Sequence, residues 1–529
     1  MIQLMRILGV ALPYLLLVVP HIYFVPLWDG AIYAEVVLRA AGAKFDIWTL
    51  NHADHPGIGS LLIPALFVKA TGGQLWGLQL GSIVLGVFGI IGFLSIVDAL
   101  FREISRLERS FIALTFSSMP VYAATTLNTN LDFGTLVFFL LFLASLLHQR
   151  FYAAAVFGGM LLLAKEAGIV VWVATIIAYS TAVILRREGA PSEKIRKMIR
   201  MTPAFFGILA LVAYIVVRMK NKQGLIWASA ASQDKGLVEQ MTSFSLLDPV
   251  FKAYLALIFS VNFMWIPTLF IATGVVAWMA RSLINAQPRN FAMRRELIVL
   301  LTVTLLLVLT RFRTFANIRY FLPIFPALLL AFAHAMQGLV PSPLKRVGIF
   351  GLTTILFLTS AIRTIDPVSR RIFGTFVFGE HPILSITSIT NECCGKGRDQ
   401  LVYNLEFVLF DELINRAFSD VRPTESQPIV VPDAANWWLV SPMTAADPPR
   451  RTIQGRPSRQ TPMISAREVV ARAAPPERLF WLGMPLVDGS GEVELLKMRY
   501  EIIDRKFYEK DGYSLSGLVM ARKSNVEPQ

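Results

Sequence analysis

Long apolar runs separated by short polar segments fill the first two thirds of the chain. Eleven of these runs are candidate membrane spans: Met5–Val25, Leu78–Leu100, Phe111–Thr126, Gly134–Leu147, Phe151–Ala164, Gly168–Leu185, Pro203–Val217, Tyr254–Ala280, Leu297–Thr310, Tyr320–Met336 and Val347–Ala361. Several are shorter than the roughly 20 residues that cross a bilayer, so their ends must extend into polar flanks. The pattern predicts an all-α polytopic membrane bundle, with about 11 transmembrane helices, over residues 1–362.

The remaining residues, 363–529, have the pattern of a small soluble domain. Two short buried strands, a hairpin around Asp511–Gly512 and an amphipathic helix are expected there. The strands are Gln427–Pro432 and Arg478–Leu482. The hairpin joins Tyr500–Phe507 to Tyr513–Ala521, and the helix is Asn404–Phe418. We therefore expect a C-terminal α/β domain, and nothing in it has a catalytic pattern.

The composition agrees with a membrane protein. Hydrophobic residues make up 55% of the chain and charged residues 16%, with a mean hydropathy of +0.56. Soluble domains average about 45–50% and about 25%, so a single soluble globule and a disordered chain are both excluded. Two adjacent cysteines, Cys393 and Cys394, cannot form a zinc motif or a redox CxxC. They are unrelated thiols, thiols that pair with a partner, or a vicinal disulfide.

The net charge of +14 belongs entirely to the apolar part. Residues 1–362 contain 29 Lys and Arg against 15 Asp and Glu, whereas residues 363–529 contain 21 of each. The excess lies in short loops between apolar runs, as orientation signals do. It does not form a basic stripe on a soluble face, so no nucleic acid partner is expected.

The positive-inside rule then orients the chain. With a cytoplasmic N-terminus, the inner segments contain most of the loop cations: Arg6, Arg102, Arg106, Arg109, Arg150, Arg186–Arg200, Arg281–Arg295, Lys345 and Arg346. The first loop (residues 26–74) and the C-terminal domain then lie outside. No N-x-[ST] sequon occurs, which favours a bacterial inner membrane, with the domain in the periplasm or outside the cell, over a eukaryotic secretory membrane.

The first outer loop holds the first candidate for chemistry. Asp29 directly follows the first span, and residues 30–41 have the spacing of a helix that lies on the surface. Asp29 is then either a functional acid or the N-cap of that helix. His55-Pro56 opens a second apolar stretch, residues 57–70, which is short enough to be a re-entrant or interfacial helix.

Further charged residues recur at the outer ends of later runs. Asp132 precedes one apolar helix, and Lys165-Glu166 separates two others. Three outer arginines, Arg311, Arg313 and Arg319, run against the orientation bias, so they bind either lipid headgroups or a phosphate. Ionisable groups at membrane depth mark functional sites. Acids and cations around one cavity suit group transfer from a phosphate leaving group.

The order of these features resembles the dolichyl-phosphate-mannose protein mannosyltransferase-like family of GT-C glycosyltransferases, which includes the lipid A aminoarabinose transferases. The motifs are DGAIYAE, HPGIGSLLIPALFVKATG, NTNLDFGTLVFFLLFLASLL, LLLAKEAG and RYFLPIFPALLLAFA. Each is weak alone, but five in order over residues 1–340 are fairly specific. The resemblance implies an inverting membrane glycosyltransferase with a polyprenyl-phosphate sugar as donor, and it leaves open whether a divalent metal takes part.

The resemblance also implies roles for individual residues. Asp29 matches the presumed base and Asp132 the acid before the fourth span, and both are expected to be catalytic. Lys165, Arg319 and Tyr320 match positions that contact the donor phosphate. Four further residues in or near these motifs are expected to bind substrate: Tyr33, His55, Glu166 and Arg313.

One position departs from the pattern. Many relatives have Asp-Glu where this chain has Asp29-Gly30, so Glu35 or Asp54 is a candidate for a second acid. The acceptor implied by the resemblance is a glycan, a lipid or a protein.

A transporter or flippase of a lipid-linked saccharide is the alternative function, because it would bind the same phosphate without cleaving a bond. No internal repeat of the kind that transporters show is evident. The polar residues also collect at one face and not at the midplane, which favours the transferase.

Overall fold

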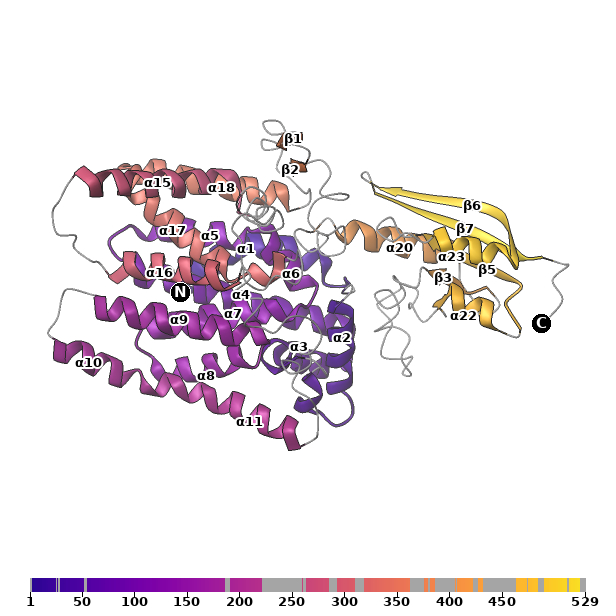
Figure 1. Ribbon diagram of the computed structural model, residues 1–529, viewed down its shortest axis with the longest axis horizontal. Coiled ribbons are helices and arrows are strands. Elements are labelled where there is room, and N and C mark those ends of the chain that lie inside the picture. The colour runs from indigo at the N-terminus through magenta and orange to yellow at the C-terminus, as the bar shows by residue number, and fades with distance from the viewer. Residues whose placement is uncertain are drawn as a thin grey trace.

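The computed structural model of the chain describes residues 2–24, 26, 29–51, 55–185, 191–220, 259, 263–284, 293–309, 318–361, 375–378, 381–385, 405, 407–421, 427–431, 463–472, 474–483, 490–510 and 513–523. A helical bundle occupies the part up to residue 361, and a small mixed sheet lies beyond one of its ends (Figure 1). The predicted division into a helical part and a C-terminal α/β part therefore agrees with the described elements.

The helices of the bundle run side by side (Figure 1). They are α1 (Ile2–Val18), α2 (Asp29–Ala40), α3 (Ile58–Ala70), α4 (Leu75–Leu100), α5 (Arg106–Ser117), α6 (Pro120–Leu127), α7 (Leu131–Leu147), α8 (Phe151–Leu162), α9 (Glu166–Leu185), α10 (Pro191–Arg200), α11 (Gly207–Lys220), α15 (Trp265–Ile284), α16 (Met293–Leu309), α17 (Ile324–Leu339) and α18 (Pro343–Ser360). Short 3₁₀ turns η1 (Val19–His21), η2 (Ile47–Leu50), η3 (Thr202–Phe206) and η5 (Ile318–Phe321) connect them.

The predicted count of eleven spans is not confirmed. Within the described residues, four segments are long and apolar enough to cross a membrane, or up to five if one bent pair counts as a span. The four are Gln3–His21, Leu75–Leu100, Glu166–Leu185 and Pro191–Met219. Other apolar helices, such as α7 and α8, have 17 and 12 residues, below the usual length of a span.

The expected span Phe111–Thr126 is broken into α5 and α6, which are bent by 50°. The break lies at Met119-Pro120, where Met119 is extended and Pro120 begins α6. Proline disfavours the helical conformation in the residue before it, so a single continuous helix is not expected at this point.

The two helices predicted in the first loop are present. α2 packs one side on α3, with Ala34 and Val37 fully buried. α3 runs antiparallel to the first turns of α4, because Pro64 lies against Gly81 while Thr71, further along α3, lies against the earlier Gly77. The pairing of α3 with the start of α4 agrees with the short non-crossing helix expected there.

Polar contacts sort the helix ends into two groups. At the end opposite α2, Asp98 binds Arg6 and Arg109 at 2.7 and 3.1 Å. Buried Glu108 binds Arg346 there through two hydrogen bonds of 2.6 and 3.0 Å. The three arginines come from segments that the sequence analysis placed on the same side, and they lie at one end of the bundle.

The C-terminal domain is built on a five-stranded sheet of order β4-β3-β5-β7-β6. Its strands are β3 (Ile429–Val431), β4 (Met463–Ser465), β5 (Arg478–Gly483), β6 (Tyr500–Lys510) and β7 (Tyr513–Arg522). β4, β3 and β5 are parallel, whereas β6 and β7 form the predicted antiparallel hairpin. Two strands expected at 427–432 and 478–482 are thus confirmed as β3 and β5.

Three helices accompany the sheet: α20 (Phe407–Val421), α22 (Ala466–Ala471) and α23 (Ser490–Lys497). α20, predicted as an amphipathic helix, lies between the bundle and the sheet (Figure 1). Leu405 N donates to Ala361 O at 2.7 Å, and Glu412 of α20 pairs with Lys510 at the end of β6. The domain therefore docks at the α2 end of the bundle. A separate hairpin joins β1 (Thr375–Phe378) and β2 (His381–Ser385); Cys393 and Cys394 lie outside the described residues.

Candidate functional site

Ser60, in the first turn of α3, contacts the chain at the start of α7 and just before α9. Its hydroxyl donates to Leu131 O at 2.7 Å and lies 3.3 Å from Ala164 O. The neighbouring Gly59 N donates to Leu163 O at 2.9 Å. A Cβ on Gly134 would lie 2.2 Å from the Ser60 hydroxyl, so this position leaves no space for a side chain. α3, α7 and α9 therefore begin in fixed positions relative to one another.

The turn before α7 directs polar side chains into the bundle. Asn128, Thr129 and Asn130 are all at most 4% exposed, and Thr129 adopts a left-handed conformation with φ of 51°. Asn130 stands at the N-cap of α7 but makes no side-chain cap. Its Oδ1 instead accepts a hydrogen bond from Arg319 Nη1 at 3.1 Å. Asp132 follows in the first turn of α7, where the helix dipole favours a negative charge.

Asp132 and Lys165 form a buried ion pair. Lys165 Nζ donates to both carboxylate oxygens, at 3.0 and 2.9 Å, and the two residues are 4% and 7% exposed. The Lys165 ammonium also lies 4.2 Å from the centre of the Tyr320 ring, a favourable contact between a cation and an aromatic face. The expected donor-site lysine and tyrosine are thus in direct contact.

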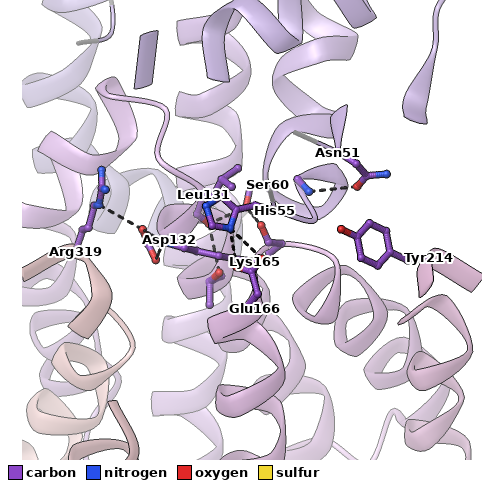
Figure 2. Close-up of polar contacts among 12 residues, drawn as sticks. Asn51, His55, Ser60, Leu131, Asp132, Lys165, Glu166, Tyr214 and Arg319 are labelled. Carbon is purple, nitrogen blue, oxygen red and sulfur yellow. Dashed lines mark hydrogen bonds and ion pairs between the residues drawn. The ribbon is translucent and has the colours of Figure 1, made fainter. Parts of the chain in front are cut away.

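Arg319 approaches the same carboxylate from η5. Its Nε lies 3.6 Å from Asp132 Oδ2, and its side chain is 5% exposed. The guanidinium also lies 5.4 Å from the Tyr320 ring centre. Figure 2 shows Arg319 and Lys165 on either side of Asp132. One carboxylate between two cations leaves this group with a net positive charge, which suits an anion.

His55 and Glu166 form a second pair beside the first. His55 Nδ1 lies 2.9 and 2.8 Å from the two Glu166 oxygens. A carboxylate only accepts hydrogen bonds, so His55 Nδ1 carries the proton in this contact. The two side chains are 30% and 21% exposed, and this pair is therefore more open than the buried pair of Asp132 and Lys165.

Two residues of α11 that the sequence analysis missed lie near this pair. Tyr214 and Arg218 are each 5% exposed, and Arg218 Nη1 donates to the Tyr214 hydroxyl at 3.3 Å. Figure 2 shows the Tyr214 hydroxyl facing the side of Glu166 and His55. A tyrosine and an arginine four residues apart, at the end of the apolar run Pro203–Val217, were the available signal.

The N-terminus of α2 packs directly on the turn before α7. A Cβ on Gly30 would lie 2.0 Å from Asn128 O, so only glycine fits there. A glutamate at position 30, as in the Asp-Glu pattern of the family that the sequence resembles, would collide with the Asn128 backbone. Asp29 is the first residue of α2, and its side chain lies outside the described residues.

The other predicted residues lie elsewhere or outside the described part. Tyr33 is 7% exposed and belongs to the apolar cluster of α2 and α3, which also includes Leu131. Glu35 forms an ion pair with Arg39 one turn later in α2. Asp54 and Arg313 lie outside the described residues. The described residues contain no group of three or more His, Cys, Asp or Glu that could hold a metal ion.

Comparison with solved structures identifies the fold. ArnT from Cupriavidus metallidurans, in a structure bound to undecaprenyl phosphate, matches 100% of this chain and 99% of its own, with a TM-score of 0.54 and 12% identity. The chain has a GT-C fold. The apo structure of the same ArnT matches with a TM-score of 0.53 and 12% identity over 95% and 96% of the two chains.

The GT-C fold was expected from the resemblance in sequence, and that expectation is confirmed at the level of fold. The archaeal oligosaccharyltransferase AglB from Archaeoglobus fulgidus matches less closely, with a TM-score of 0.46 and 10% identity over 99% of this chain and 74% of its own. No protein-family model and no curated protein matches the sequence.

Proposed function

We propose that the protein is an integral-membrane glycosyltransferase. It moves a sugar from a polyprenyl-phosphate donor to a hydroxyl or amine of an acceptor glycan, lipid or protein, at the outer face of a bacterial inner membrane. The observation that carries the proposal is the meeting of Lys165 and Arg319 at buried Asp132. Two desolvated cations at one helix end suit a phosphate leaving group, and the GT-C fold is consistent with such a donor.

Lys165 and Arg319 bind the donor phosphate. An ammonium has three N–H donors and a guanidinium five. Lys165 directs two contacts to Asp132, which leaves donor capacity for a phosphate oxygen. The positive charge stabilises the phosphate as the bond to the sugar breaks, which is when negative charge develops on the leaving oxygen.

Asp132 acts as a positioning residue in this proposal and not as a base. Its two oxygens already accept hydrogen bonds from Lys165, and Arg319 approaches one of them. Both carboxylate oxygens are thus occupied by contacts with the two cations. It is suited to hold the two cations at the distance that a phosphate requires.

Asp29 is the proposed base. The packing of Gly30 on Asn128 brings the first turn of α2 to the turn that leads to Asp132. Asp29 takes the proton of the acceptor group, and the acceptor attacks the anomeric carbon from the side opposite the phosphate. The bond between that carbon and the phosphate oxygen breaks, its electron pair stays on the phosphate, and the sugar is transferred with inversion.

The proposed orientation has a cytoplasmic N-terminus and an outer C-terminal domain. The separation of the cationic loops at one end from the Asp132 group at the other supports it. Reporter fusions at Arg196 and near Ser516 should report inside and outside. A cytoplasmic C-terminal domain would contradict both the orientation and the site of transfer.

The experiment uses purified protein in lipid vesicles and undecaprenyl-phosphate sugars with a labelled sugar. Release of undecaprenyl phosphate supports transfer if the labelled sugar is then found free, after hydrolysis, or attached to an added acceptor. Movement of intact donor across the bilayer without cleavage supports the flippase instead. Lys165→Ala should abolish release, whereas Lys345→Ala, an exposed lysine at the opposite end of the bundle, should not.

A further inference from the structure

The open pair of His55 and Glu166 has no part in the phosphate site, although Glu166 directly follows Lys165. The two side chains make separate contacts: Lys165 binds Asp132, and Glu166 binds His55. Figure 2 shows the two pairs next to each other. A sugar attached to a phosphate at Lys165 can therefore lie beside the groups around Glu166.

We propose that His55, Glu166 and Tyr214 form the subsite for the sugar ring that is transferred, next to the phosphate site. The inference rests on the proposed function, because it takes a glycosylated carrier as the ligand. It names the part of that ligand that each group of residues recognises. Lys165 and Arg319 bind the phosphate, whereas the new subsite binds the hydroxyl groups of a polyhydroxylated sugar.

The polar groups of this subsite match sugar hydroxyls in their hydrogen-bonding capacity. The Glu166 carboxylate can accept about four hydrogen bonds. It accepts from His55 Nδ1 through its two oxygens. The Nδ1 contact directs the opposite edge of the imidazole, with Nε2, away from Glu166. Glu166 can thus accept from sugar hydroxyls while His55 presents a second polar nitrogen.

Tyr214 supplies a donor of fixed direction. Its hydroxyl oxygen accepts from Arg218 Nη1 at 3.3 Å, so the hydroxyl hydrogen points elsewhere and can be donated to a ligand oxygen. The aromatic ring gives the same residue an apolar face, and sugar-binding pockets combine apolar surface with a few placed polar groups. The side chains of His55 and Glu166 are 30% and 21% exposed, so a ligand can reach both of them.

The test compares the binding of a bare carrier with that of a glycosylated one. The full-length protein in nanodiscs is titrated with undecaprenyl phosphate and with undecaprenyl phosphate that carries mannose, glucose or arabinose. The measured quantity is the ratio of the two dissociation constants. For the wild type, we expect at least one sugar to tighten binding about tenfold or more, the usual worth of a hydrogen bond to a charged group.

Glu166→Gln and Tyr214→Phe should both reduce this ratio towards one, while the affinity for bare undecaprenyl phosphate stays the same. Tyr214→Phe removes a single oxygen and serves as the second variant if Glu166→Gln disturbs folding. Glu193→Gln, the same change at an exposed acid of α10, is the matched control and should change neither affinity.

Two outcomes would overturn the subsite. One is a wild type that binds every glycosylated carrier no better than the bare carrier. The other is a pair of variants that weaken both ligands equally, as expected if the residues only support the phosphate site or the fold. The proposed function fails differently, through sugar-dependent binding without any cleavage of the donor, so the two failures are distinguishable.

Discussion

Lys165, just before α9, and Arg319, just before α17, contact the same carboxylate, that of Asp132 at the start of α7. The three residues come from separate turns, and each is at most 7% exposed. Two cations that meet at one buried carboxylate form a site whose charge suits an anionic ligand. This relationship is the physical basis of the proposed phosphate site.

Removal of either cation should weaken binding of the carrier phosphate. Lys165→Ala and Arg319→Ala each remove charge-assisted hydrogen bonds worth about 1.5–3 kcal/mol, which corresponds to about a tenfold to hundredfold loss of affinity. Titration of undecaprenyl phosphate against the protein in nanodiscs measures this loss. Lys345→Ala controls for charge alone, and unchanged affinity in both site variants would exclude a phosphate between these cations.

Asp132→Asn should make the protein unusually dependent on its ligand. The change removes the carboxylate that both buried cations contact and should lower stability by about 3–5 kcal/mol. Because a phosphate replaces the missing negative charge, undecaprenyl phosphate should raise the melting temperature of this variant more than that of the wild type.

Asp98→Asn is the matched control for that experiment. Asp98 also lies between two arginines, Arg6 and Arg109, but at the opposite end of the bundle. Its substitution should lower the melting temperature without any added response to undecaprenyl phosphate. An equal response of both variants would mean that the effect of the ligand is not local to Asp132.

The contact between Ser60 and Gly134 should be intolerant of any added side chain. A Cβ on Gly134 would lie 2.2 Å from Ser60 Oγ and 2.5 Å from its Cα, so Gly134→Ala should cost about 1–3 kcal/mol through overpacking. Gly348→Ala, at an open position of α18, should be neutral or stabilising, since alanine favours helix more than glycine does. Thermal unfolding of both variants in nanodiscs tests the difference.

The C-terminal domain should lose stability at alkaline pH. Burial raises the pKa of Tyr500 from 10.0 to about 12, so the folded state favours the neutral phenol. This contribution is complete below pH 10 and is lost as the pH rises from about 10 to about 12, because the unfolded chain ionises first. Denaturant unfolding followed by Trp481 fluorescence should show a shallower decline for Tyr500→Phe. An identical decline would remove Tyr500 as its source.

Much of the fold follows from local patterns. The alternation in β6 and β7 was enough to predict their hairpin, and apolar runs located α4, α9 and α18 closely. The break between α5 and α6 was missed because the apolar run continues through Met119-Pro120. The number of spans also stayed uncertain, because burial within a bundle and burial in lipid select the same apolar residues.

The site residues that could be predicted are charged residues next to apolar runs. Lys165, Asp132 and Arg319 stood out as charges at the ends of apolar runs, and the structure brings them together. Ser60 did not stand out, because a serine hydroxyl in an apolar helix usually bonds to its own backbone. Tyr214 did not stand out, because a tyrosine within an apolar run usually packs in a core. Their roles depend on which helices are neighbours, and one sequence read by itself does not contain that information.

The most direct test of the account measures donor cleavage and donor binding in Asp29→Asn. Asparagine caps a helix about as well as aspartate, so folding should be preserved, but basicity is lost. We predict that the variant binds labelled undecaprenyl-phosphate sugar as the wild type does and releases undecaprenyl phosphate ~10²–10⁴-fold more slowly. Release at the rate of the wild type would contradict Asp29 as the base and the mechanism of transfer built on it.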